Sequence, residues 1–140
     1  MGFWNFRKAK REESARERIA RARIILSNAR AHPDFCCDVC GPYGHYHYSC
    51  RNAARFAIKG LLIFRGRQFE EPAIGLKSLT TLAFEGLPDR DRCLATVNRL
   101  LAYLPGFDFR DEAPTQAMLD DTFLLAEEII VIVTSVLPAK

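Results

Sequence analysis

The sequence predicts an all-α protein, an up-and-down bundle of about five helices. Apolar residues recur at steps of three and four along most of the 140 residues, which is the period of an amphipathic helix. Proline and glycine punctuate these segments where helices start and stop, and no segment reads convincingly as a strand. The length suits one domain, residues 1–140, with a single hydrophobic core.

The first helix is expected from about Lys8 to Ala31. Its apolar stripe, set among charged residues, consists of Ala15, Ile19, Ala22, Leu26 and Ala29. Pro33 ends the helix, because the residue before a proline is pushed out of the α region. Residues 32–47, rich in Cys, Gly, Tyr and His, are then predicted to form a long connection. Loops of this length inside a compact domain usually have a function.

The second helix is expected from Tyr48 to Arg65 and is predicted to be the most buried. Gly66 follows it, in the place where a left-handed residue closes a helix. Its predicted inward residues are Ala53, Phe56, Ala57, Gly60, Leu61 and Phe64. A shorter third helix is expected after Pro72, which suits a first helical turn, and Gly86 marks its end.

Two further helices complete the predicted bundle. Asp89 is expected to cap the fourth, which runs to about Leu104. The fifth is expected from about Pro114 to Leu137. Its inward residues are predicted to be Met118, Thr122, Leu125, Ile129, Ile132 and Val136. The β-branched run 129–133 is assigned to this helix because the 3.6-residue register continues through it.

Charge is unevenly distributed along the chain. Residues 1–30 hold nine Lys or Arg and three Glu, whereas residues 31–140 hold eleven basic and fourteen acidic residues. Such a basic segment either steers an anionic partner such as RNA or is a solvated helix surface. The first ten residues lack the apolar stretch of a signal peptide, and no apolar run is long enough to cross a bilayer. We therefore expect a cytoplasmic protein that does not span a membrane.

A cluster of cysteine and histidine residues is the feature of the sequence that predicts the most specific chemistry. Cys37, Cys40, His45 and Cys50 are spaced as Cys-x2-Cys-x4-His-x4-Cys, with glycines at positions 41 and 44. Zinc takes thiolate and imidazole ligands in a tetrahedron, and a Cys-x2-Cys pair presents two sulfurs to one ion. The spacing resembles the zinc-knuckle pattern. Four protein ligands leave no open coordination position, so the predicted zinc is structural.

Several alternatives to this ligand set stay open. Cys36 or His47 replaces a named ligand in one alternative, and the segment binds no metal in another. Cys50 also suits the start of the second helix as a small apolar residue. Asp38 stands where nucleic-acid-binding knuckles usually carry an aromatic residue. A disulfide is disfavoured because nothing else marks the chain as secreted.

The stretch from Tyr48 to Gly66 resembles the second helix of HEPN domains. There an aromatic residue or cysteine opens the helix, Ala and Lys recur along it, and a Leu-Leu pair precedes a glycine turn. The remaining predicted helices follow in the family's order, so the resemblance covers roughly residues 10–137. It implies a HEPN-like fold, homodimerisation, and a role as partner of a small nucleotidyltransferase in a two-protein module such as a toxin–antitoxin pair.

Many HEPN domains are ribonucleases that use an Arg followed four to six residues later by His. Neither Arg51 nor Arg110 is followed by a histidine at that distance. The general acid or base that such chemistry needs near neutral pH is therefore absent from the expected place. This departure favours a non-catalytic protein. A HEPN-type ribonuclease toxin with a displaced site would have to use His45 or His47.

The leading hypothesis is thus a non-catalytic, HEPN-like binding module with a structural zinc loop. RNA binding is the alternative. Tyr46, with its neighbours Tyr43 and Tyr48, could stack on bases while Arg51 and Arg55 hold phosphates. The same tyrosines could equally pack the loop onto the bundle.

Overall fold

The computed structural model describes residues 3–32, 44–67, 75–106 and 115–139, and these ranges form helices and turns without strands. The all-α prediction is confirmed over these residues, which hold five helices. They are α1 (Phe3–Ala31), α2 (Gly44–Phe64), α3 (Leu76–Ala83), α4 (Arg90–Gly106) and α5 (Gln116–Val136). None of the described helices is long and apolar enough to span a membrane.

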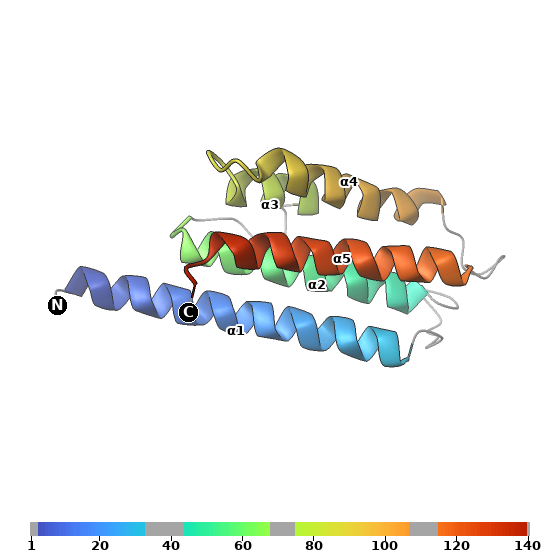
Figure 1. The fold of residues 1–140 in the computed structure, drawn as a ribbon, viewed down its shortest axis with the longest axis horizontal. Coiled ribbons are helices and arrows are strands. Elements are labelled where there is room, and N and C mark those ends of the chain that lie inside the picture. The colour runs from blue at the N-terminus through green and yellow to red at the C-terminus, as the bar shows by residue number, and fades with distance from the viewer. Residues whose placement is uncertain (1–2, 33–43, 68–74, 107–114, 140) are drawn as a thin grey trace.

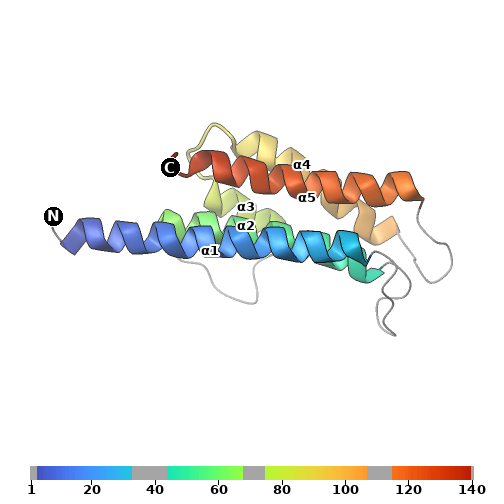
Figure 2. The same ribbon diagram turned by 60° about the horizontal axis from the view of Figure 1, so that its bottom comes forward.

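The helices run up and down along one common direction (Figure 1). α1 lies along one side, α2 and α5 lie in the middle, and α3 and α4 cover the opposite side. α2 runs antiparallel to α1, and α5 antiparallel to α4. Turning the molecule brings α1 to the front with α5 beside it (Figure 2). α2 is the central element, because it contacts each of the other four helices.

Two helices begin earlier than the sequence predicts. α1 begins at Phe3 rather than Lys8, and α2 begins at Gly44 rather than Tyr48. The extra turn of α2 contains Tyr46, which lies one helical turn before Cys50; both side chains are buried. Tertiary burial of this face therefore outweighs the weak helix propensity of Gly, His and Tyr at these positions.

Boundaries of the other three helices also differ from the predicted ones. α3 begins at Leu76, and Pro72 lies outside the described residues. α5 begins at Gln116, because the Thr115 side chain accepts a hydrogen bond from the backbone N–H of Met118 and so caps the helix. Pro114 is likewise outside the described residues. α4 continues to Gly106, two residues beyond its predicted end.

α1 packs against α2 through very small side chains. The five predicted inward residues of α1 are all buried, and three of them are alanines. α2 also has small buried residues, namely Ala53, Ala54, Ala57 and Gly60. A Cβ atom built on Gly60 would lie only 3.0 Å from the backbone oxygen of Ala15. The backbones thus approach so closely at this point that glycine is the residue that fits without displacement.

The turns and three buried threonines are stabilised by local hydrogen bonds. Gly66 and Gly86 have φ of 66° and 78°, the left-handed conformation predicted for Gly66 at the end of α2. Backbone hydrogen bonds from Gly66 and Arg67 back to residues 63 and 62 complete the helix closure. The buried Thr80, Thr96 and Thr122 each donate a hydroxyl hydrogen bond to the carbonyl four residues earlier.

The contact at Gly60 generates a first prediction. Replacing Gly60 with Val places three carbon atoms against the backbone and side chains of α1, so we expect the free energy of unfolding to fall by about 2 kcal/mol. Urea unfolding followed by circular dichroism measures this change.

Ala20→Val on the exposed surface of α1 is the matched control. It introduces the same β-branched side chain into a helix without a close neighbour, and we expect a loss of about 0.5 kcal/mol. Equal effects of the two substitutions would show that α1 and α2 are not tightly packed at Gly60.

Candidate binding surface

The predicted zinc ligands are only partly within the described structure. Cys37 and Cys40 lie outside the described residues, and His45 lies in the first turn of α2 with its side chain undescribed. Among the side chains that are described, no group of three or more His, Cys, Asp or Glu residues is arranged to hold a metal ion. Zinc binding by this segment therefore stays a prediction.

Cys50 has the surroundings of a core residue. Its side chain is fully buried, and its thiol is hydrogen-bonded with Tyr46. Burial raises the pKa of the Cys50 thiol to about 12, and the contact with Tyr46 only partly offsets this. In the metal-free chain the thiol is therefore protonated at neutral pH, as is usual for a buried cysteine. Its burial fits the alternative in which Cys50 is a small apolar residue of the second helix, although it lies in the second turn of α2 and does not open it.

His47 is also buried, at the α2–α4 contact. Its ring lies 6.3 Å from that of Tyr103, centroid to centroid, and it is 3 % exposed. Burial, and then the nearby Arg51, lower the pKa of His47 to about 4, so the ring is neutral at neutral pH. Tyr103 in turn donates a hydrogen bond to the carboxylate of Asp121, which lies 3.6 Å from Arg99. This polar group joins α2, α4 and α5.

The three residues predicted to bind RNA, Tyr46, Arg51 and Arg55, differ in their exposure to solvent. Tyr46 is buried, and its hydroxyl donates a 3.0 Å hydrogen bond to the Leu119 carbonyl of α5. It is therefore not available to stack on a base, because the pairing of α2 with α5 uses both its ring and its hydroxyl. Tyr48, by contrast, is 53 % exposed. Arg51 and Arg55 are half-buried on α2.

Arg51 and Arg55 belong to a basic region where α1 meets α2. Lys59 continues their spacing at the next turn, and α2 contains no Asp or Glu. Burial and then the charges of Arg55 and of Arg18 on α1 lower the pKa of Lys59. Arg18, Arg55 and Lys59 thus lie near one another, and Arg51 lies one turn before Arg55 on α2. The sequence identified two of them, and their convergence with α1 depends on how the helices pack.

A second surface, formed by α1 and α5, is not among the sequence predictions. We call it the α1–α5 face; it consists of Arg16, Arg23, Arg30, Asp120, Leu124, Glu127 and Val131. The arginines lie seven residues apart on α1, and each reaches α5 or the residues after it. Arg16 donates to the Pro138 carbonyl, Arg23 donates to the Thr134 hydroxyl over 3.4 Å, and the Arg30 guanidinium lies 4.6 Å from the ring centre of Phe123.

The α5 side of this face is acidic and apolar. Leu124 and Val131 are 57 % and 49 % exposed, whereas the other large apolar side chains of α5 are buried or partly buried. They lie two turns apart, and Asp120 and Glu127 alternate with them along the same surface. α5 has four carboxylates and no Lys or Arg. The face therefore has a basic row on α1 and an acidic and apolar row on α5.

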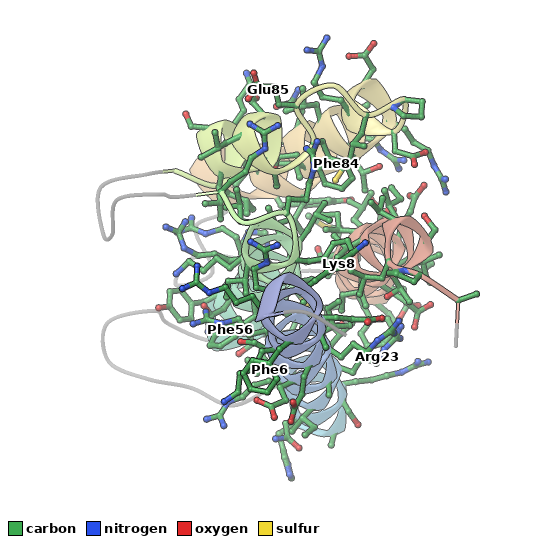
Figure 3. All side chains as sticks on the ribbon, turned by 90° about the vertical axis from the view of Figure 1, so that its left-hand side faces the viewer. Phe6, Lys8, Arg23, Phe56, Phe84 and Glu85 are labelled. Carbon is green, nitrogen blue, oxygen red and sulfur yellow. The ribbon has the colours of Figure 1, made fainter. Side chains whose placement is uncertain are left out.

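A pocket of about 430 Å³ lies at one end of this face. It is lined by Arg30, Tyr46, Gln116, Leu119, Asp120, Phe123 and Leu124. Its walls combine a stacked guanidinium with aromatic and leucine side chains, the residue types that anchor protein partners. Asp120 in this pocket is held by a 2.9 Å hydrogen bond from the Gln116 amide. Figure 3 shows Arg23 on the side of α1 toward α5, across α1 from Phe56.

Part of this face could have been found in the sequence. The heptad spacing of the three arginines is visible, and so are the apolar residues at 124 and 131, which fall outside the buried register of α5. Their meeting on one face depends on α1 packing beside α5. That pairing joins helices far apart in the chain, so periodicity alone does not reveal it.

Comparison of the chain with protein-family models, with characterised proteins and with solved structures gives no match.

The zinc prediction can be tested directly by elemental analysis of the purified protein. We expect about one zinc per chain and a lower melting temperature after chelation, because a structural metal stabilises only the folded state. Cys40→Ser is expected to abolish zinc binding. Cys50→Ala is expected to keep it, since the Cys50 thiol lies in the core.

Two outcomes would contradict these expectations. Protein that contains no zinc and melts at the same temperature with chelator would exclude the metal. Loss of zinc in Cys50→Ala, with the helix content unchanged, would restore Cys50 as a ligand.

Proposed function

We propose that this chain is a non-catalytic, HEPN-like binding module that dimerises or binds a nucleotidyltransferase partner through its α1–α5 face. The predicted zinc segment between α1 and α2 would have a structural role. Two features support a HEPN-like arrangement: the five described helices follow the expected order, and the third of them is short.

The exposure of Leu124 and Val131 carries the proposal. Large apolar side chains left exposed two turns apart, beside a pocket with an arginine–phenylalanine stack, are typical of a protein-binding surface. The charged residues around them would form a polar rim, which supports specificity more than affinity.

The double variant Leu124→Asp/Val131→Asp tests this proposal. Both side chains are exposed, so we expect the helix content and melting temperature to stay close to those of the wild type. We expect at least about tenfold weaker binding to a co-expressed nucleotidyltransferase, or to a second copy, because charge replaces the apolar anchors. Size-exclusion chromatography with light scattering measures both.

Tyr48→Ala is the matched control, since Tyr48 is similarly exposed but lies on α2. We expect it to bind the partner as the wild type does. A wild-type chain that neither dimerises nor retains a nucleotidyltransferase would overturn the proposal.

RNA binding is a second candidate, favoured by the grouping of Arg18, Arg51, Arg55 and Lys59 where α1 meets α2. Phosphate backbones bind to such groups, and the exposed Tyr48 lies one turn before Arg51. The surface is separate from the α1–α5 face, so the two candidates respond to different substitutions.

A poly-uridine oligonucleotide is a suitable probe for this second candidate. We expect binding to weaken steeply with salt, and Arg51→Gln/Arg55→Gln to reduce the slope of log K against log salt by about 0.7 for each lost phosphate contact. Arg92→Gln/Arg99→Gln on α4 removes the same charge elsewhere and is expected to leave the slope nearly unchanged. No binding at low salt would exclude RNA.

A further inference from the structure

We infer that the α1–α5 face is the interface of a two-fold homodimer, in which α1 of each copy lies on α5 of the other. This inference rests on the proposed function and names its partner as a second copy of the chain. It follows from the charges of the face, from their arrangement in rows, and from the heights at which they lie along the bundle.

Four charged residues of this face form no ion pair within the described residues. Ion pairs with described acidic residues are formed by Arg16, Arg67, Arg90, Arg92 and Arg99. Arg23, Arg30, Asp120 and Glu127 form none in the same part of the chain, although all four are exposed. Arg23 reaches only a hydroxyl, and Arg30 only an aromatic ring. Two positive and two negative charges therefore have no ion-pair partner among the described residues, although Arg30 and Asp120 line the same pocket.

The separation of these charges into rows makes the face complementary to itself. A two-fold axis running along the helices places the α1 row of each copy on the α5 row of the other, so that opposite charges meet twice. An axis perpendicular to the helices within the face would place α1 on α1 and bring arginines together. The charge pattern therefore selects the first arrangement, in which the facing α1 and α5 helices run antiparallel.

The heights of the side chains agree with this arrangement. Within one chain Arg30 lies level with Phe123, and Arg23 reaches Thr134. A two-fold axis along the bundle leaves every residue at its own height, so Arg30 meets the segment of the second copy that holds Asp120 and Leu124. Arg23 meets the segment between Glu127 and Thr134. Leu124 of each copy is then covered beside the partner's pocket.

Two charge-reversal variants test the dimer. One carries Arg23→Glu/Arg30→Glu and reverses the α1 row; the other carries Asp120→Arg/Glu127→Arg and reverses the α5 row. Sedimentation equilibrium from about 1 µM to about 1 mM covers the range that a weak interface requires. We expect the wild type to dimerise. Each variant alone should dimerise at least about tenfold more weakly, because like charges then face each other.

Mixing the two variants provides the decisive measurement. In the mixed pair each row again faces the opposite charge, so a heterodimer is expected to form about as tightly as the wild-type dimer. The variant with all four substitutions should homodimerise again. Circular dichroism shows whether each variant keeps its helix content, and rescue on mixing itself requires folded chains.

The outcomes separate this inference from the proposed function. A wild type that stays monomeric up to the highest concentration overturns the dimer, whereas the binding module survives if a nucleotidyltransferase is still retained and Leu124→Asp/Val131→Asp releases it. A dimer unaffected by both row reversals overturns the assignment of the face. Two weakened variants that do not recover on mixing overturn the pairing of α1 with α5.

Discussion

The close contact between α1 and α2 is the constraint on which the rest of the bundle depends. Small residues on both helices, with Gly60 against the backbone of Ala15, let the two backbones lie closer together than larger side chains would permit. α2 then has its other sides available for α3, α4 and α5, all of which it contacts. α1 in turn lies beside α5 along one edge, and that edge presents the three arginines, of which Arg30 lines the pocket.

The helices were predictable where apolar periodicity was long and uninterrupted. All five inward residues assigned to α1 are buried, and so are Thr122, Leu125, Ile129 and Ile132 of α5. The β-branched run at the end of α5 is helical, as its register predicted. The start of α2 was missed because glycine, histidine and tyrosine favour other conformations locally. What makes this turn helical is the burial of Tyr46 and its hydrogen bond to Leu119, a contact between distant parts of the chain.

The candidate sites were less predictable than the fold, because they too depend on contacts between distant parts of the chain. A spacing of cysteines and histidines indicates which residues could share an ion, but it does not show which of them belong to the core. Cys50 and Tyr46 were both assigned to binding roles from the sequence, and the structure buries them against each other. The α1–α5 face shows the converse: its residues are ordinary one by one, and only the packing of the first helix beside the last brings them together.

The sorting of charge across the molecule also has a kinetic consequence. α1 and α2 are rich in cations, while the charged residues of α5 are all carboxylates, so charge is separated across the width of the fold. The resulting field acts on an approaching charged body before any side chains touch, and it turns the two molecules into register while they are still separated by solvent. At physiological ionic strength it extends about 8 Å from the surface. Salt would therefore slow the encounter of partners more than it would shorten the lifetime of the complex once formed.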